Sequence, residues 1–511
     1  MKRAAFLIML ISILSKLLGF GREMVQSYVF GASAITDAYL VSGTIPSQIF
    51  GFISAGIATG FIPMYSRILK DQGRSGANRY VNNLVNVLLL LATATVVIVI
   101  LLTEPLVKLF AGGFRGETLE LAVNFTRIAV FGVYCSAVSS IFVGYLRLHR
   151  KYVLPTLAGL ASNLILIPAF YLSAKINIYI LAGGSLLASA LPLVLLIPAI
   201  RGAGFKYQLI SDFKDKEIKT MIRLALPVAL SRSVSRINVL VDRTLASAIA
   251  VGGISALNYA DRIGGFIQGL FVDSITAVLY PNISKMAAEG DIKGLKKTIS
   301  EAIGIINLIT IPATAAAMIF SREIVALLFG RGAFSPEAQK MTAASLFYYS
   351  LGTIPKGLRS AASRSFYARQ DMKTPALNAT VGVVINIALN IILSKFMGLG
   401  GLALATSISA LITAVLMFVT LRQKIGPFGL KEISKSFLKI SGASALMGWA
   451  AWCSFSFLGR HHSRNLSLIG AGSVGAMIYA LLIYFLKIPE VENTLDVLKT
   501  KWENRKIEAG D

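Results

Sequence analysis

Long apolar runs recur along the whole chain and are separated by short polar or charged segments. A helix needs about 20 apolar residues to cross a bilayer, whereas the strands of a spanning barrel alternate at every second residue. The runs do not alternate, so they predict an all-α integral membrane protein with about 14 transmembrane helices. The predicted spans begin near Ala4, Thr36, Tyr80, Thr118, Val153, Ile178, Thr220, Ile254, Lys297, Glu337, Thr374, Gly400, Ile433 and Leu466.

The chain also repeats itself at an offset of 218 to 220 residues. Residues 63–67 (PMYSR) are echoed by residues 281–285 (PNISK), and Pro155 after a basic loop is echoed by Pro375 after another. Six spans return the chain to its starting side, so duplicated halves share one orientation, as in parallel-repeat transporters. We therefore predict an N-lobe at 1–205, a linker at 206–219, a C-lobe at 220–430, two final helices at 431–487 and a tail at 488–511.

Composition supports the membrane assignment, and a membrane location changes how the high net positive charge is interpreted. The chain has 511 residues, of which 55% are hydrophobic and 15% charged, and a mean hydropathy of +0.69. A formal net charge of +25 would suggest nucleic acid in a soluble protein. Most Lys and Arg instead fall in alternate loops, as the positive-inside rule describes, so we predict no nucleic-acid partner and place both termini in the cytoplasm. The basic N-terminus lacks a small-residue cleavage site and is predicted to form the first span.

A set of cations remains within or near the spans once the loops are set aside, and few carboxylates lie at comparable depth. A cation at a helix centre costs roughly 2.5–3.5 kcal/mol on insertion scales, so such residues avoid lipid and usually mark a substrate path. The surplus of positive charge therefore predicts an interior cavity for an anion. The cations are Lys16, Arg22, Arg127, Arg223, Arg232, Arg236, Arg243, Arg262, Lys356, Arg359 and Arg364, and the carboxylates are Asp37, Asp242, Asp261 and Asp273.

Helical spacing groups several of these cations. Arg232, Arg236 and Arg243 are spaced by four and seven residues, which places them within about 40° on one helix face. Lys356 and Arg359 share a face, and Arg262 aligns with Asp273 eleven residues later. Lys16 and Arg22, six apart, align only if Gly19 and Gly21 permit a bend.

Structural roles offer an alternative for part of the set. Arg243 could pair with Asp242 and Arg262 with Asp261, and Arg127, Arg223 and Arg364 could snorkel to an interface. Neither explanation covers the whole set, because the cations outnumber the carboxylates. Arg offers a fork of donors to phosphate and Lys a point charge.

Sequence motifs that could indicate an enzyme lack the structural context that such motifs require. Residues 470–475 (GAGSVG) match a nucleotide-binding pattern but lie inside an apolar span. Cys135 and Cys453 have neither disulfide nor metal spacing and are interpreted as small core residues. We find no nucleophile–base pair, so the sequence predicts a transporter without a cofactor rather than an enzyme.

Five stretches resemble the MurJ (MviN) family of lipid II flippases in the MOP superfamily. They are residues 14–23 (LSKLLGFGRE), 30–39 (FGASAITDAY), 258–262 (NYADR), 328–334 (LFGRGAF) and 367–375 (YARQDMKTP). The resemblance implies two six-helix lobes around a cationic cavity, with a hydrophobic groove toward the last two helices for a polyprenyl tail. It also implies a bacterial cytoplasmic membrane and assigns Arg22, Asp37, Arg262 and, where many members have Arg, Lys16 to the cavity. One departure is that residues 47–52 (SQIFGF) lack the Arg and Glu of many members, for which Arg232, Arg236 or Arg243 could substitute.

The resulting hypothesis is that the protein acts as a monomer and flips lipid II from the inner to the outer leaflet by alternating access. Lys16, Arg22 and Arg262 would bind pyrophosphate, Asp37 would order the cations, and Arg232, Arg236, Arg243, Lys356 and Arg359 would complete the site. Membrane potential or an ion gradient would drive the cycle. The alternatives are a flippase for another undecaprenyl-linked glycan, a drug/cation antiporter, and a membrane transferase acting on the same lipid.

Overall fold

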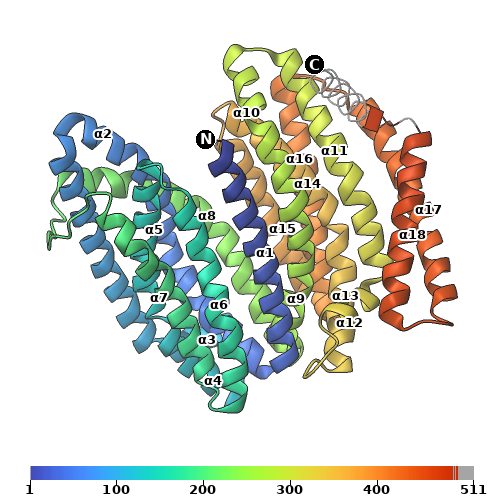
Figure 1. The fold of residues 1–511 in the computed structure, drawn as a ribbon, viewed down its shortest axis with the longest axis horizontal. Helices are drawn as coiled ribbons and strands as arrows, with labels where there is room; N and C mark the ends of the chain where they lie inside the picture. The colour runs from blue at the N-terminus through green and yellow to red at the C-terminus, as the bar shows by residue number, and fades with distance from the viewer. Residues whose placement is uncertain (1, 487, 489–490, 493–511) are drawn as a thin grey trace, which may run out of the picture. The chain divides into compact units, whose positions relative to one another are not determined.

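The computed structural model describes residues 2–486, 488, 491 and 492, and it leaves undescribed the side chains of 2–6, 55, 58, 59, 227, 228, 230–235 and 430. Within that part of the chain every regular element is helical, as the apolar runs predict. The chain forms two compact units (Figure 1). The predicted tail at 488–511 lies almost entirely outside the described residues.

Unit 1 contains Met1–Ala256 and the separate segment Phe329–Ala338. Its helices pack mainly through the pairs α1–α6, α2–α5, α2–α8 and α6–α7. They are α1 (Lys2–Phe30), α2 (Ala34–Leu101), α3 (Thr103–Phe110), α4 (Gly116–Ala129), α5 (Gly132–Leu148), α6 (Val153–Lys175), α7 (Ile180–Arg201), α8 (Lys216–Ile249) and the start of α9 (Gly253–Ile267).

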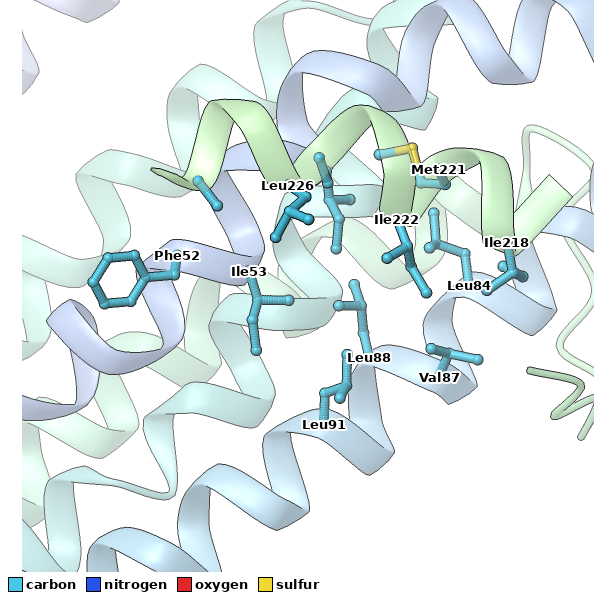
Figure 2. A pocket seen from close by; sticks show the side chains of 13 residues that line it. Phe52, Ile53, Leu84, Val87, Leu88, Leu91, Ile218, Met221, Ile222 and Leu226 are labelled. Carbon is cyan, nitrogen blue, oxygen red and sulfur yellow. The ribbon is translucent and has the colours of Figure 1, made fainter. Parts of the chain in front are cut away.

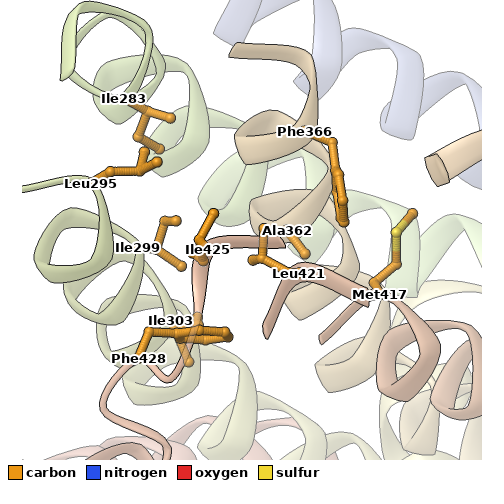
Figure 3. Packing of buried hydrophobic residues seen from close by; sticks show 10 residues of the cluster. All are labelled: Ile283, Leu295, Ile299, Ile303, Ala362, Phe366, Met417, Leu421, Ile425 and Phe428. Carbon is orange, nitrogen blue, oxygen red and sulfur yellow. The ribbon is translucent and has the colours of Figure 1, made fainter. Parts of the chain in front are cut away.

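Unit 2 contains Leu257–Leu328 and the chain from Gln339 onward. A core cluster fixes α10, α11, α14 and α16 to one another, and Figure 3 shows its side chains converging from these helices. The elements of this unit are the rest of α9, the π-helix η1 (Gln268–Val272), α10 (Asp273–Glu289), α11 (Ile292–Ile319), α12 (Ser321–Leu328), most of α13 (Pro336–Leu351), α14 (Thr353–Ala368), α15 (Lys373–Met397), α16 (Leu399–Ile425), α17 (Leu430–Leu458) and α18 (Arg464–Phe485).

The structure divides the predicted spans differently from the apolar pattern. α2 runs through two of them and is interrupted at Gly73, whose φ is 68°. The span predicted from Thr118 is the pair α4 and α5, bent by 42°, and the span predicted from Glu337 is α13 and α14. Among the described residues, eight helices, or nine with the bent pair, are long and apolar enough to cross a membrane. The protein is therefore a multi-pass membrane protein, and the number of fourteen spans stays a prediction.

The order of elements repeats near the predicted offset. The short helices α3 and α12 begin at Thr103 and Ser321, 218 residues apart, and each is followed by a two-part helix and a helical hairpin. The turns before the hairpins contain the positive-φ residues Arg150 (57°) and Gln370 (59°), 220 residues apart. This correspondence supports a duplicated helical unit.

The packing units do not follow the repeat, because α8 packs against α2 and so belongs to unit 1. The predicted lobe boundaries at 205 and 220 therefore stay a prediction about duplication, which packing does not test. The linker before α8 is bound to α2 through its backbone. Asn82 donates to the Lys206 carbonyl (2.9 Å), and Asn86 donates to the carbonyls of Gln208 (3.0 Å) and Ile210 (2.8 Å).

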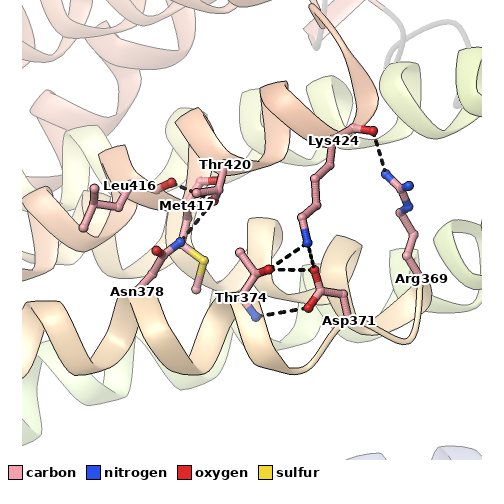
Figure 4. Close-up of polar contacts among 8 residues, drawn as sticks. All are labelled: Arg369, Asp371, Thr374, Asn378, Leu416, Met417, Thr420 and Lys424. Atoms are coloured by element: carbon pink, nitrogen blue, oxygen red, sulfur yellow. Dashed lines mark hydrogen bonds and ion pairs between the residues drawn. The ribbon is translucent and has the colours of Figure 1, made fainter.

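A polar turn in unit 2 orders the start of α15 (Figure 4). The Asp371 carboxylate accepts from the backbone N–H of Thr374 (3.0 Å) and from its hydroxyl (2.7 Å), which caps the helix. Lys424 at the end of α16 pairs with the same carboxylate. Burial alone would raise the pKa of Asp371, but the bonds from Lys424 and Thr374 lower that pKa to about 2.

Candidate functional site

Arg22 is held on α1 by groups from two helices. Its Nη2 donates to Oε1 of Glu23 (2.5 Å), and its Nη1 donates to Oδ1 of Asn163 on α6 (3.2 Å). Glu23 is almost fully buried, whereas 24% of the Arg22 side chain is exposed. Glu23 is thus a buried carboxylate that the sequence analysis left out, although it stands next to Arg22 in the chain. Asn163 gave no sequence signal, because it lies 141 residues away.

Lys16 lies exposed on α1, about 1.7 turns before Arg22. α1 continues as a single α-helix through Gly19 and Gly21, so the bend that these glycines could permit does not form. Lys16 and Arg22, six residues apart, therefore point in directions that differ by about 120°. This separation is the one expected for residues six apart on a helix without a bend.

Asp37 is 1% exposed and makes a specific contact in unit 1. Its Oδ1 accepts from the backbone N–H of Ser255 at 2.7 Å, in the first turn of α9. The first N–H groups of a helix have no partner within the helix, so a buried carboxylate at this place stabilises the start of α9. The structure thus gives Asp37 a capping contact 218 residues away in the chain. Its role in ordering cations stays a prediction.

Arg236 on α8 contacts the stretch of α2 that lacks the family's Arg and Glu. Its Nη1 donates to the carbonyls of Ser47 (3.1 Å) and Gln48 (3.0 Å) and to Oε1 of Gln48 (2.6 Å). The guanidinium also lies over the Phe52 ring, 5.0 Å from the centroid. A Cβ at Gly51 would lie 2.3 Å from Nη2, so the missing side chain at Gly51 makes room for the guanidinium. These three acceptor oxygens are neutral.

Two more of the predicted cations, Arg243 and Arg232, lie on α8. Arg243 is half-buried beside Asp242, whose Oδ2 accepts from Nδ2 of Asn238 at 3.3 Å. The side chain of Arg232 lies outside the described residues. The four-and-seven spacing therefore keeps these positions on one face of a continuous α8, as predicted, while the function of each cation stays a prediction.

In unit 2 an ion pair connects Lys356 on α14 with Asp261 on α9. Nζ of Lys356 lies 3.7 Å from Oδ1 of Asp261 and 5.5 Å from the centroid of the Tyr349 ring. The Asp261 side chain is 61% exposed, which limits the strength of this pair. Arg262 follows Asp261 on α9 and is exposed, and Arg359 lies half-buried one turn after Lys356.

The alignment predicted for Arg262 and Asp273 does not hold. η1 lies between them, at Gln268–Val272. A π-turn bonds each residue to the fifth one along instead of the fourth, so it shifts the helix face relative to an ideal α-helix. The eleven-residue rule assumes an uninterrupted α-helix, and this prediction is therefore wrong.

The described residues contain no group of three or more His, Cys, Asp and Glu that could hold a metal ion. Cys135 and Cys453 are free thiols, but Cys453 is exposed on α17, so its interpretation as a core residue is wrong. Two of the predicted cations have carboxylate partners, since Arg22 pairs with Glu23 and Lys356 pairs with Asp261. Among the predicted site residues whose side chains are described, seven are Lys or Arg and one, Asp37, is a carboxylate.

The all-helical fold of this chain is the one found in membrane transporters of the MOP superfamily. The fold agrees with an inward-facing multidrug transporter of the MATE family, with a TM-score of 0.69 at 16% identity over 84% of this chain and 99% of that one. The chain belongs to the MurJ family, because the family model described as "Lipid II flippase MurJ" matches residues 26–472. Its family is one of transporters rather than enzymes.

Relatives named as flippases cover most of the chain. A probable lipid II flippase MurJ of Thermotoga maritima is 28% identical over 487 residues, covering 94% of this chain and 96% of that protein. One of Rhizobium meliloti is 28% identical over 421 residues, covering 80% and 78%. A solved lipid II flippase MurJ in an inward closed conformation matches with a TM-score of 0.83 at 26% identity, over 94% of this chain and 98% of that one.

Proposed function

We propose that this protein flips lipid II, the polyprenyl-pyrophosphate-linked peptidoglycan precursor, from the inner to the outer leaflet of the bacterial cytoplasmic membrane. The observation that carries the proposal is the match of the MurJ family model to residues 26–472, in a chain that has cations on α1, α8, α9 and α14. A pyrophosphate needs several positively charged donors, and Arg side chains suit its geometry.

The chemistry of each predicted residue gives it a part in headgroup binding. Arg22, oriented by Glu23 and Asn163, and Arg236, oriented by the α2 backbone, are held in fixed positions, so they would lose little side-chain entropy on binding. Lys16, Arg262 and Arg359 supply further charge, with Lys356 beside Asp261. Arg232 and Arg243 complete the proposed set, and Asp37 supports it through the start of α9.

The tail and the energy source complete the proposal. The polyprenyl tail would remain in lipid along α17 and α18. The headgroup would cross the membrane as the protein alternates between a state open to the inside and a state open to the outside. An inside-negative potential contributes about 2.3 kcal/mol per charge per 100 mV. It favours outward movement of an anionic headgroup and inward return of the emptied cationic site. The protein would act as a monomer with both termini in the cytoplasm.

A vesicle flipping assay with purified protein and fluorescent lipid II tests this function. Arg22→Ala and Arg262→Ala should each lower the flipping rate at least tenfold, because each removes a donor to pyrophosphate. Arg460→Ala, which changes a loop cation, is the matched control and should retain the wild-type rate.

Wild-type flipping in both Arg22→Ala and Arg262→Ala would refute the site. Transport of another undecaprenyl-linked glycan but not lipid II, in the same vesicles and in a depletion strain, would refute the substrate while leaving the flippase class intact.

A further inference from the structure

An apolar groove in unit 1 is not used by the proposed headgroup site, although its lining residue Phe52 lies under the Arg236 guanidinium. It has a volume of about 340 Å³ and lies between α2 and α8. Figure 2 shows side chains from two stretches of α2 and from the first half of α8 pointing toward the same space. The lining residues are Phe52, Ile53, Ile57, Leu84, Val87, Leu88, Leu91, Ile218, Met221, Ile222, Ala225, Leu226 and Ala229.

The shape of the groove matches one hydrocarbon chain. On α8 the lining residues run from Ile218 to Ala229, a distance of about 16 Å at 1.5 Å per residue. One leaflet contributes about half of a hydrocarbon core that is ~30 Å thick. Because the lining side chains are all apolar, water would find few partners there, whereas an acyl chain would bury apolar surface.

The groove is open along an apolar edge. Ile222 is 49% exposed and Leu226 is 57% exposed, and both line the groove as well. A lipid chain can therefore enter sideways from the bilayer. α2 and α8 pack closely beside the lining residue Ala225, since a Cβ at Gly56 would lie 2.4 Å from Cβ of Ala225.

Two cations border the half of the groove that begins at Ile218, which the loop charges predict to be the cytoplasmic side. Lys219 and Arg223 are exposed on α8, four residues apart and so on one side of the helix, next to the lining face. The neighbouring carboxylate of Glu217 is paired with Arg67. Over the described residues, neither Lys219 nor Arg223 pairs with a carboxylate, so both are available to an anionic headgroup.

We propose that this groove binds an anionic diacyl phospholipid of the cytoplasmic leaflet, with one acyl chain between α2 and α8 and its phosphate on Lys219 and Arg223. Charge complementarity selects the occupant, because a basic rim above an apolar groove favours an anionic headgroup over a zwitterionic one. A bound lipid would stabilise unit 1, since it binds the packed pair α2–α8 and not the unfolded chain.

Native mass spectrometry of the full-length, delipidated protein tests this site. Dioleoyl phosphatidylglycerol should bind more tightly than dioleoyl phosphatidylcholine and should raise the unfolding temperature. Leu91→Trp fills the groove and should abolish the tight phosphatidylglycerol site. Leu90→Trp is its matched control, because Leu90 is 47% exposed and does not line the groove.

A second pair of variants tests the rim without changing the packing. Lys219→Gln with Arg223→Gln should weaken phosphatidylglycerol binding about 30-fold, while Lys293→Gln with Lys297→Gln makes the same charge change elsewhere and should have little effect. Equal binding of the two phospholipids, or tight phosphatidylglycerol binding in Leu91→Trp, would overturn the proposal. The proposal would also be overturned if Leu91→Trp removed the binding of undecaprenyl phosphate but left the binding of phosphatidylglycerol unchanged.

Discussion

The contact between Gly51 and Arg236 gives a quantitative prediction for Gly51→Ala. The new Cβ would lie 2.3 Å from Nη2, so the guanidinium must move away from Ser47 and Gln48. Hydrogen bonds to a charged group contribute about 1.5–3 kcal/mol. The Ser47 and Gln48 carbonyls also accept hydrogen bonds within α2, so they lose little stabilisation when the guanidinium moves away. We therefore expect the total loss in unfolding free energy to be of the order of one hydrogen bond to a charged group, about 2 kcal/mol.

Gly43→Ala is the matched control for this substitution. Gly43 also lies within α2, and nothing is within 4 Å of its added Cβ. Both substitutions gain roughly 0.5–1 kcal/mol from the higher helix propensity of Ala, so this gain cancels when the two variants are compared. The difference in unfolding free energy between them should therefore equal the loss of the Arg236 contact, about 2 kcal/mol.

The assay is unfolding of the solubilised protein for a double-mutant cycle with Arg236→Ala. Gly51→Ala should destabilise the wild-type protein but not the Arg236→Ala protein, in which no guanidinium occupies the space. If Gly51→Ala and Gly43→Ala were equally stable, or if Gly51→Ala cost as much without Arg236, the steric argument would be refuted. In flipping assays Gly51→Ala should lower activity if Arg236 binds the headgroup from this position.

Two further predictions concern carboxylates that cap helices. Asp37→Ala should destabilise the protein by about 1–2 kcal/mol, because Ser255 loses its partner in a buried place, and Asp37→Asn should recover much of that loss in a thermal unfolding measurement. Asp371 has a lowered pKa of about 2, so its contribution to stability is present above its unfolded pKa near 4 and is lost as pH falls toward 2. Asp371→Asn should flatten this part of the pH–stability profile, and an unchanged profile would exclude the Lys424–Asp371–Thr374 contact as its source.

Part of the candidate site was visible in the sequence because charge inside an apolar helix is conspicuous. Lys16, Arg22, Arg236 and Arg262 stand out for that reason, and helical spacing places the α8 cations on one face. One prediction made from spacing alone was wrong, because η1 shifts the helix face between Arg262 and Asp273.

The apolar helices, the internal echoes and the surplus of cations could be predicted from the sequence, because apolar length, local periodicity and charge are properties of the chain alone. The partners became known from the folded protein: Asn163 for Arg22, Ser255 for Asp37 and the α2 backbone for Arg236. These partners lie more than 140 residues apart in the chain. Helical periodicity fixes which residues share a face, but the element opposite that face depends on how all the helices pack, which no local pattern encodes.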